Sequence, residues 1–341
     1  MSQTQTFHGY AALEAGEKLQ KWDYEPATLG RLDIEIQVTH NGLCHTDIHM
    51  RDNDWNLSSF PLIAGHEVVG KITQIGVDVT SFQIGDRVGF GWIRNSCRNC
   101  EACLRGEENV CRQGYTGLII GHHGGFTNRL RAPADFAYKI PDALDSASAA
   151  PLLCAGITVY TPLRTYLKHP GMKVGVIGIG GLGHLAIKFA SSMGAEVTAF
   201  STSIDKEDEA KEFGAHHFRH WNTPEDLKQA SGTQDLVIST SPSAIDWDKA
   251  FNLLANNGVF CLVGLPVSTL NVPLLPLVFG QKVIAGSIVG GRRFMREMLD
   301  FAAINQIKPM IETMPLSDIN AAIDKVAANK ARYRIVLVSE N

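Results

Sequence analysis

The stretch "VIGIGGLGHLA", residues 176–186, carries three glycines in the order G-x-G-x-x-G. They are Gly178, Gly180 and Gly183, and they follow an apolar run and open a helical pattern. Glycines at these positions allow a tight turn and let the backbone approach a pyrophosphate at the helix N-terminus. The alternative is a glycine-rich turn with a structural role alone. In its strand–turn–helix context, the motif predicts a dinucleotide-binding site.

The sequence around this turn alternates apolar runs with helical patterns, from about residue 155 to residue 291. Such alternation is typical of a doubly wound sheet of parallel strands, and a complete dinucleotide-binding domain needs six strands. We therefore predict a Rossmann domain over residues 155–291, with a six-stranded parallel sheet. The runs that predict its strands are "KVGVIG", "EVTAFS", "HHFRHW", "DLVIST", "VFCLVG" and "KVIAGS".

The part of the chain before residue 155 has short β-type runs separated by Gly and Asp, such as "RLDIEIQVTH" and "HEVVGKITQIG". This pattern predicts an antiparallel or barrel-like β domain. From about Arg292 the pattern becomes helical and closes with the strand-like run "RYRIVLV", which we expect to return to the first domain. The predicted division of this α/β protein is residues 1–154 with 292–341, and residues 155–291.

The composition excludes some classes of partner. Of 341 residues, 45% are hydrophobic and 19% are charged, and the formal net charge of -4 gives no basic stripe for nucleic acid or an anionic membrane. The opening "MSQTQTFHGY" has neither a basic leader nor an apolar run. No uninterrupted apolar stretch approaches the roughly 20 residues that span a bilayer. We expect a cytoplasmic protein without a nucleic-acid or membrane partner.

A cluster of four cysteines lies in "SCRNCEACLRGEENVC", residues 96–111. Disulfides are rare in a reducing compartment, so we expect the cluster to hold a metal. An iron–sulfur cluster is one alternative, but the bacterial ferredoxin run ends C-x₃-C-P, whereas here seven residues separate the last pair and Arg112 follows. A thioredoxin-like C-x-x-C would lie near a βαβ unit. The four residues are Cys97, Cys100, Cys103 and Cys111.

The end of the second predicted strand, "AFSTSIDKEDEA", bears on the choice of cofactor. An NAD site usually carries an acid here, which bonds the ribose 2′-hydroxyl. Hydroxyl groups and a lysine instead suit a 2′-phosphate, although Asp205, Glu207 and Asp208 are typical of an ordinary polar loop. The sequence therefore favours NADP over NAD. The candidate phosphate-binding residues are Ser201, Thr202, Ser203 and Lys206.

Three further residues are candidate zinc ligands: Cys44 in "NGLCHTDIH", His66 in "AGHEVVG" and Cys154 in "APLLCAGIT". Two thiolates and one imidazole are ligands of a catalytic zinc that keeps its fourth position open. Taken singly, a buried cysteine is usually a small core residue, and a lone histidine usually has a structural partner. Spacing alone does not join these three residues into one site.

Five motifs carry a resemblance to a known family: "CHTD" at 44–47, "GHE" at 65–67, the four-cysteine stretch, "PLLCAGITVY" at 151–160 and "GIGGLG" at 178–183. The chain resembles the zinc-dependent medium-chain alcohol dehydrogenases along essentially its whole length. Within them it is most similar to the cinnamyl-alcohol-dehydrogenase branch and its bacterial aldehyde-reductase relatives, which use NADP(H). The resemblance implies a GroES-like β-rich catalytic domain together with the doubly wound Rossmann domain.

The resemblance also implies two zinc ions per chain. Cys44, His66 and Cys154 would bind the catalytic ion. The four clustered cysteines would form a closed structural site in a lobe over residues 97–111, and a closed site leaves no room for a substrate.

Further roles follow from the same resemblance. Glu67 would approach the catalytic metal from behind its ligands and help water and substrate exchange. Thr46 would hydrogen-bond the alcohol or alkoxide, His49 would pass the proton to the surface, and His45 would lie near the pyrophosphate. The alternative for the two histidines is a pair of surface imidazoles. The implied cofactor-binding residues are His45, Gly178, Gly180, Gly181, Leu182, Gly183, Ser201, Thr202, Ser203, Lys206, Thr240, Val263, Gly264, Ser287 and Arg334.

The implied activity is the interconversion of primary alcohols and aldehydes with NADP(H), on aromatic or medium-chain aliphatic substrates, by a homodimer or homotetramer. One alternative is an NAD-dependent alcohol or polyol dehydrogenase, although polyol enzymes generally have Glu in place of Cys154. Another is a zinc-ribbon binding protein without activity, which the acidic charge disfavours. Cys261 has no assigned role beyond the core. Residues that could line an apolar pocket, or equally belong to the core, are Trp55, Leu57, Trp92 and Tyr115.

Overall fold

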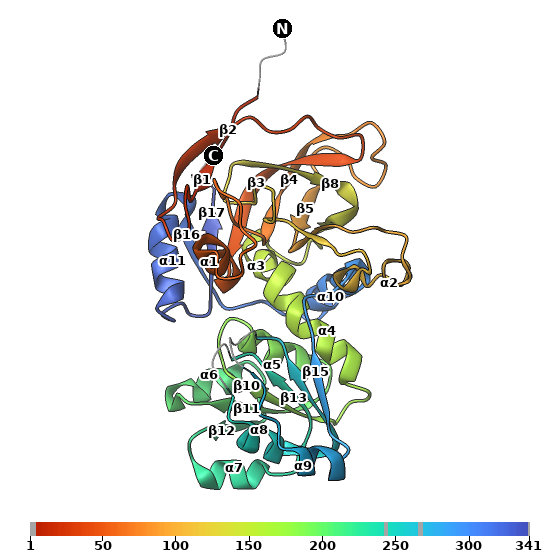
Figure 1. Cartoon of the computed structure of the whole chain (residues 1–341), viewed down its shortest axis with the longest axis vertical. Coiled ribbons are helices and arrows are strands. Elements are labelled where there is room, and N and C mark those ends of the chain that lie inside the picture. The colour runs from red at the N-terminus through yellow and green to blue at the C-terminus, as the bar shows by residue number, and fades with distance from the viewer. Residues whose placement is uncertain (1–4, 242–244, 265–268, 340–341) are drawn as a thin grey trace. The chain divides into compact units, whose positions relative to one another are not determined.

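A computed structural model shows the chain as two compact units (Figure 1). One unit is formed by Met1–Cys154 together with Gly290–Asn341, and the other by Ala155–Val289. The second boundary lies two residues before the position expected from the sequence. The structure describes residues 5–241, 245–264 and 269–339.

The unit Ala155–Val289 is built on a six-stranded sheet in which all neighbouring strands are parallel, as predicted. In spatial order the strands are β12 (His217–His220), β11 (Glu196–Ser201), β10 (Lys173–Ile177), β13 (Gln234–Ser239), β14 (Leu254–Leu262) and β15 (Val283–Gly286). The chain thus runs from β10 to one edge and then crosses to β13. Doubly wound sheets bind cofactors where the order reverses, at the carboxyl ends of the strands.

The central strands of this sheet are buried on both faces, which explains their nearly continuous apolar sequences. Phe200, Phe251 and Phe260 are fully buried and pack with Trp247 in one core cluster. The helices of the unit are α4 (Ile157–Tyr166), α5 (Gly183–Ser192), α6 (Glu207–Glu212), α7 (Pro224–Ala230), α8 (Trp247–Leu253) and α9 (Leu274–Phe279).

The other unit contains a seven-stranded sheet and two two-stranded sheets, which confirms a β-rich domain. The sheet runs in the order β16 (Ile311–Pro315), β17 (Arg334–Val338), β3 (Asp33–Leu43), β4 (Val68–Ile75), β5 (Arg87–Phe90) and β9 (Ala137–Lys139), with β8 (Arg129–Pro133) on β3. All these pairs are antiparallel except β16 with β17. The two-stranded antiparallel sheets are β1 (Phe7–Ala11) with β2 (Gln20–Tyr24), and β6 (Ile93–Asn95) with β7 (Thr116–Gly117).

Short helices connect these strands. The α-helices of this unit are α1 (His45–Asp52), α2 (Glu101–Leu104), α3 (Ser146–Pro151), α10 (Arg292–Ile304) and α11 (Ile319–Ala327). The short turns of other helix types along the chain are η1 (Glu108–Val110), η2 (Ala134–Phe136), the π-helical η3 (Leu152–Gly156), η4 (Ile204–Lys206) and η5 (Leu316–Asp318).

The C-terminal strand returns to the first part of the chain, as expected from its sequence. Strand β17 pairs antiparallel with β3, and Ile335 lies opposite Leu43. This pairing places Arg334 beside the end of β3, and Cys44 is the residue that follows this strand.

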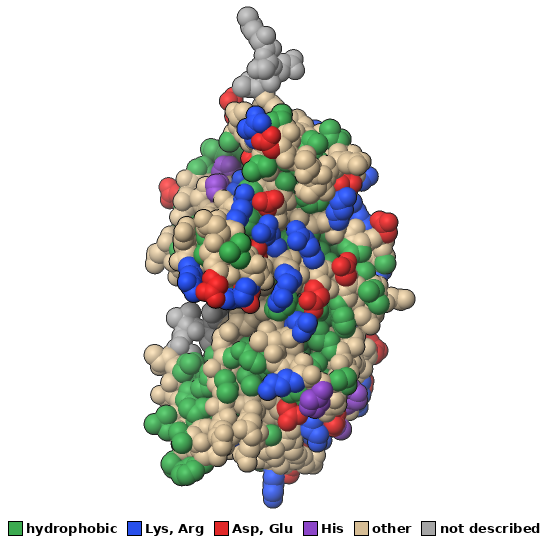
Figure 2. Space-filling view, turned by 90° about the vertical axis from the view of Figure 1, so that its right-hand side faces the viewer, with side chains coloured by type: hydrophobic (Ala, Val, Ile, Leu, Met, Phe, Trp, Pro, Cys, Tyr) green, Lys and Arg blue, Asp and Glu red, His purple; other side chains and the backbone are tan. Residues whose placement is uncertain are grey.

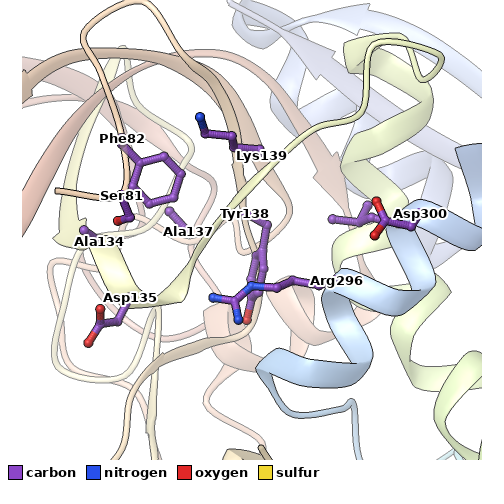
Figure 3. Close-up of a pocket in the computed structure, with 10 residues that line it drawn as sticks. Ser81, Phe82, Ala134, Asp135, Ala137, Tyr138, Lys139, Arg296 and Asp300 are labelled. Atoms are coloured by element: carbon purple, nitrogen blue, oxygen red, sulfur yellow. The ribbon is translucent and has the colours of Figure 1, made fainter. Parts of the chain in front are cut away.

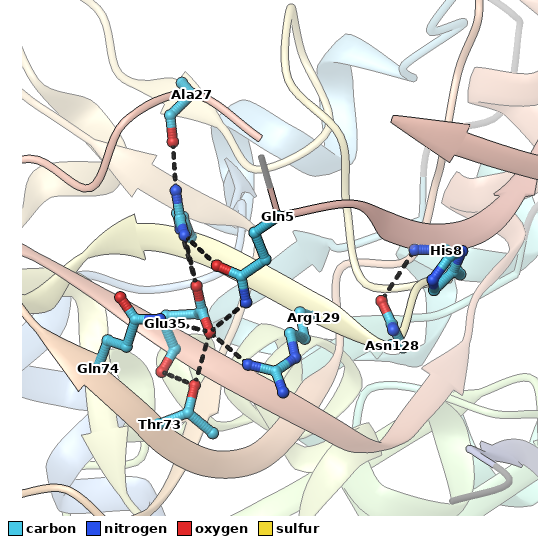
Figure 4. Close-up of polar contacts among 9 residues, drawn as sticks. Gln5, His8, Ala27, Glu35, Thr73, Gln74, Asn128 and Arg129 are labelled. Carbon is cyan, nitrogen blue, oxygen red and sulfur yellow. Dashed lines mark hydrogen bonds and ion pairs between the residues drawn. The ribbon is translucent and has the colours of Figure 1, made fainter. Parts of the chain in front are cut away.

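A buried carboxylate ties three strands of this sheet together (Figure 4). Glu35 on β3 is fully buried and pairs with Arg129 and Arg131 of β8, with the shortest N–O distances at 2.7 and 2.8 Å. Thr73 of β4 donates to it at 2.9 Å, and Arg131 also donates to the side chain of Gln5. Burial alone would raise the pKa of Glu35, but the bonds from the two arginines hold it below its usual value.

One helical run, Ser146–Tyr166, is long and apolar enough to cross a membrane by length and composition. The sequence alone did not single it out because Ser148, Thr158 and Thr161 interrupt the apolar residues. In the structure 89% of its most apolar window is buried inside the protein, which is typical of a core helix.

On the face shown in Figure 2, Lys and Arg side chains are interspersed with Asp and Glu.

Candidate active site and cofactor site

Three predicted zinc ligands meet inside the first unit. Cys44 precedes α1, His66 precedes β4, and Cys154 lies in the π-helical turn η3. Together with Glu67, each offers one ligand atom, and these atoms all lie within 4.8 Å of one another. Nε2 of His66 is 3.3 Å from Sγ of Cys154. A tetrahedral zinc would hold such a nitrogen and sulfur about 3.6 Å apart, so the cluster fits the ion.

A buried aspartate that sequence reasoning missed organises this cluster. Asp47 is 1% exposed, and its Oδ1 accepts hydrogen bonds from Nδ1 of His66 at 2.8 Å and from the backbone N of Gly65 at 2.9 Å. Its Oδ2 accepts from the backbone N of Cys44 at 3.0 Å. One carboxylate therefore fixes both ligands and turns Nε2 of His66 toward Cys154. The sequence signal was its place three residues after Cys44, where it caps the helix.

The thiols of this cluster influence each other's pKa. The bond from Cys154 is the largest influence on Cys44 and holds the pKa of that thiol well below its usual value. A lowered pKa at Cys44 favours its thiolate, the form that binds a cation.

Glu67 lies beside the cluster in a fully buried ion pair with Arg334. Burial raises the pKa of Glu67 to about 7, against the opposing effect of Arg334. Among the described residues, Oε2 of Glu67 and Nε of Arg334 have no hydrogen-bond partner. Gly42 makes room for this pair, because a Cβ there would lie 1.8 Å from Oε2. Arg334 therefore has a protein partner, Glu67, and its contact with the cofactor stays a prediction.

Helix α1 carries the predicted proton path. Thr46 is half-buried in its first turn, and His45 beside it is exposed. His49 is half-exposed, its Nδ1 lies 2.7 Å from Oδ2 of Asp54, and its ring centroid lies 5.0 Å from that of Trp55. The helix therefore extends from the half-buried Cys44 to the surface.

Three of the four candidate pocket residues lie near these groups. The ring of Trp92 meets His66 edge-on at 5.3 Å, and its Nε1 donates to the hydroxyl of Tyr115 at 3.1 Å. Trp55 contacts His49, whereas the side chain of Leu57 is 47% exposed.

The four clustered cysteines form a second group, whose sulfur atoms also lie within 4.8 Å of one another. The S–S distances are 3.6 Å for Cys100–Cys103, 3.8 Å for Cys97–Cys103 and 3.9 Å for Cys100–Cys111. A disulfide requires about 2.05 Å, whereas four sulfurs around one zinc would be about 3.8 Å apart. The spacing therefore fits a tetrahedral ion.

Backbone groups around this second cluster favour a thiolate at Cys100. Bonds from the backbone N–H groups of Cys103 and Arg112 lower the pKa of Cys100 to about 6.

The lobe is anchored to α10 by the buried Glu108, which accepts from Nε of Arg292 at 2.6 Å.

In the other unit, the glycine-rich turn leaves an open approach at the end of β10. Gly178 has a φ of +89°, which a larger residue adopts only under strain. A Cβ on Gly183 would lie 1.9 Å from the carbonyl O of Gly178. A Cβ on Gly180 would meet nothing within 4 Å, so this glycine is not required by packing and leaves space for a bound group. The turn therefore fits a pyrophosphate.

The other predicted cofactor residues of this unit follow the strand ends. The hydroxyl of Thr240, after β13, lies 3.0 Å from the carbonyl O atoms of both Ile177 and Gly178, to which it donates. The remaining residues adjoin the turn or the ends of β14 and β15, namely Gly181, Leu182, Val263, Gly264 and Ser287.

The end of β11 differs in detail from the sequence expectation. Ser201 is 6% exposed, and its hydroxyl oxygen accepts from the backbone N of Ser203 at 3.1 Å. Thr202 is exposed, and Nζ of Lys206 donates to the carbonyl O of Ile179 at 2.6 Å. The lysine thus lies across the glycine-rich turn. Asp205 and Asp208 are exposed to solvent.

The structure also contains cavities away from the predicted residues. One of about 370 Å³, in the first unit, is lined by Phe82, Tyr138, Lys139 and Arg296 among others (Figure 3). Another of about 420 Å³ includes Tyr24 and Arg94 in its lining. No predicted site residue lines either cavity.

Two family profiles match the chain over both units. The alcohol dehydrogenase GroES-like domain matches residues 30–142, and the zinc-binding dehydrogenase domain matches residues 181–303. The chain belongs to the medium-chain alcohol dehydrogenase family. This family assignment confirms the resemblance drawn from the sequence motifs.

Relatives place this alcohol dehydrogenase near the cinnamyl-alcohol-dehydrogenase branch. It is 44% identical to the aldehyde reductase AdhA of Synechocystis, over 96% of this chain and 97% of the relative. It is 39% identical to cinnamyl alcohol dehydrogenase 7 of Arabidopsis thaliana, over 96% of this chain and 94% of the relative.

Solved structures of this branch share the fold. A cinnamyl alcohol dehydrogenase of Sorghum bicolor superposes with a TM-score of 0.93 at 38% identity, covering 98% of both chains. The enzyme CAD of Helicobacter pylori, complexed with NADP(H), gives a TM-score of 0.90 at 33% identity, again over 98% of both chains.

Proposed function

We propose that this chain is a zinc- and NADP(H)-dependent alcohol dehydrogenase that interconverts primary alcohols and aldehydes, acting as an aldehyde reductase. The observation that carries the proposal is the meeting of Cys44, His66 and Cys154 in a chain of the alcohol dehydrogenase family. Two thiols and one imidazole leave a fourth position of a tetrahedral zinc open for a substrate.

Each zinc would have its own set of protein ligands. Cys44, His66 and Cys154 would hold the catalytic ion, and the four cysteines of the lobe would hold a structural one. When bound, the catalytic zinc polarises a substrate oxygen and the nicotinamide carries the hydride. Asp47 holds the ring of His66 in the orientation that directs Nε2 at this site.

The chain's own residues would move the proton. The Thr46 hydroxyl would donate to the substrate oxygen when an aldehyde is reduced and accept from it when an alcohol is oxidised. His49, three residues further along α1 and half-exposed, would exchange the proton with solvent. Trp55, Trp92 and Tyr115 would form apolar walls suited to aromatic or medium-chain aliphatic substrates.

The strand end supports NADP(H) as the cofactor. Thr202 and Ser203 carry hydroxyls, and Lys206 places a positive charge beside the glycine-rich turn. At the place where NAD sites carry an acid stands Ser201, so a 2′-phosphate meets no repulsion there. The relative from Helicobacter pylori bound to NADP(H) agrees with this choice.

An apolar surface supports a homodimer. Strand β15 is an edge of its sheet, and the neighbouring α9 exposes large apolar side chains. Phe279 is 82% exposed and Leu274 is 70% exposed. Such a patch beside an open strand edge suits a second copy of the chain, which would pair its own β15 across a twofold axis.

The seven cysteines support a reducing compartment. All are free, and none forms a disulfide in the described structure. We therefore place the enzyme in the cytoplasm. An NAD-dependent polyol dehydrogenase is the alternative activity, but Cys154 stands where such enzymes generally carry Glu.

The test is a panel of aldehydes and alcohols followed at 340 nm with NADPH and NADH, together with the zinc content of the purified protein. We expect NADPH oxidation with aromatic or medium-chain aldehydes. Turnover of polyols with NAD and none of aldehydes with NADPH would contradict the proposal.

A further inference from the structure

The residue that ends β12, His220, makes two hydrogen bonds through its ring. Nε2 lies 2.9 Å from the carbonyl O of Thr202, and Nδ1 lies 2.9 Å from Oγ1 of Thr223. A carbonyl oxygen only accepts, so Nε2 carries the proton and Nδ1 accepts from the hydroxyl of Thr223. The two bonds fix one tautomer and one orientation of the ring.

The backbone around His220 is held in the same place. Its N–H donates to Oδ2 of Asp226 at 2.8 Å, and the N–H of Trp221 donates to the carbonyl O of Ser201 at 2.8 Å. The Cα pairing of β11 with β12 ends at Ser201 opposite His220. The backbone of β12 therefore does not pair with Thr202. The ring of His220 bonds the carbonyl of Thr202 instead.

This bond determines what the end of β11 presents to a phosphate. A carbonyl oxygen carries partial negative charge and would repel a phosphate toward which it turned. The ring of His220 bonds the Thr202 carbonyl on the β12 side, while the side chain of Thr202 stays exposed. The bond holds the carbonyl of Thr202 in place, and a strand end ordered in this way would lose less conformational entropy on binding a cofactor.

We propose that His220 is a positioning residue for cofactor choice: by holding the carbonyl of Thr202, it keeps the end of β11 in the conformation that receives the 2′-phosphate of NADP(H). The inference rests on the proposed use of NADP(H). His220 lies on the neighbouring strand β12, and it bonds neither the glycine-rich turn nor the hydroxyls of residues 201–203. Its effect falls on the phosphate and leaves the nicotinamide chemistry unchanged.

Two substitutions separate the hydrogen bond from the bulk of the ring. His220→Leu removes the donor, and His220→Gln keeps an N–H at the reach of Nε2. His217→Leu is the matched control on the same strand, because His217 contacts the exposed Glu196 instead. Thermal unfolding of each variant shows whether it folds. If the leucine variant does not, Thr223→Val tests the same brace by removing the hydroxyl that orients the ring.

The readouts are the Kd values of NADPH and NADH, the competition by 2′,5′-ADP and 5′-AMP, and kcat at saturating NADPH. For His220→Leu we expect NADPH and 2′,5′-ADP to bind about threefold to tenfold more weakly, the range of one net hydrogen bond. NADH, 5′-AMP and kcat should change less than twofold. His220→Gln should recover most of the loss, and the His217 variant should match the wild type.

Two outcomes would distinguish a failure of the proposed use of NADP(H) from a failure of the role of His220. A wild-type enzyme that binds 2′,5′-ADP no better than 5′-AMP would contradict the use of NADP(H) and the inference with it. A wild type that prefers 2′,5′-ADP, with a leucine variant that keeps this preference or loses both nucleotides equally, would overturn the role of His220 alone.

Discussion

Asp47 and His66 form a fully buried pair in which Oδ1 of the carboxylate accepts from Nδ1 of the imidazole at 2.8 Å. The bond leaves Nε2 free to face Cys154. Because the same carboxylate also binds the backbone at Cys44 and Gly65, one side chain sets the relative position of two candidate ligands.

Asp47→Asn should weaken catalytic zinc binding about 10- to 100-fold, since the charged acceptor that orients His66 is lost. Zinc retention against a graded chelator measures this effect, with turnover as a second readout. The matched control is Asp23→Asn, because Asp23 makes a 2.8 Å bond to the exposed His8. Equal zinc retention in the Asp47 variant and the wild type would show that the bond does not support the site.

The two cysteine clusters should differ in what they stabilise. Cys100→Ser should lower the Tm by about 5–10 °C and leave one zinc per chain, because opening a structural site removes metal-linked folding free energy. Cys44→Ser should leave a folded chain with one zinc and no turnover. Cys261→Ala, which removes a buried thiol outside both clusters, should keep two zinc ions. Iron in the purified protein, or one metal with both clusters intact, would contradict this division.

Thr46→Val should reduce kcat roughly 100-fold, because the variant keeps the shape but loses the hydroxyl that bonds the substrate oxygen. Thr46→Ser keeps the hydroxyl and is the matched control, and it should retain most activity. His49→Gln should cause a smaller loss, because water replaces a half-exposed group. A valine variant with wild-type kinetics would remove Thr46 from the mechanism.

Removing one partner of the buried pair between Glu67 and Arg334 should lower the free energy of unfolding. Arg334→Met leaves a buried carboxylate without its counter-charge, and we expect about 3–5 kcal/mol of lost stability. Adding Glu67→Gln should restore part of that loss, which a double-mutant cycle in urea measures. The exposed pair of Arg31 with Asp78 is the control, and its removal should cost less than about 1 kcal/mol. Additive losses at positions 67 and 334 would argue against a direct interaction.

Cofactor preference should respond to the end of β11. Ser201→Asp should shift kcat/KM toward NADH, because a carboxylate there repels a 2′-phosphate and accepts from ribose hydroxyls. Lys206→Ala should weaken NADPH selectively about tenfold, the value of one bond to a charged group. Lys211→Ala removes a lysine that pairs with Glu207 on the surface and is the control. Equal efficiency of the wild type with both cofactors would contradict the assignment.

The sequence was informative wherever a local pattern carries the physics. The period of apolar residues and the three glycines were enough to predict the parallel sheet and the turn after β10, because strand burial and backbone freedom are local properties. The four cysteines within residues 97–111 likewise predicted a metal site, because they lie in one short segment of the chain. The zinc ligands at 44, 66 and 154 were joined only by resemblance to a family.

Tertiary structure alone decided which distant groups meet. The pairing of β17 with β3 brings Arg334 to Glu67, a contact that no local pattern predicts. The burial of Asp47 against His66 could not be seen in a motif, because an aspartate at a helix start usually caps that helix and no more. Likewise, the ring of His220 reaches Thr202 only because β12 lies beside β11. Hydrogen bonds between residues far apart in sequence depend on strand order and register, which no local pattern encodes.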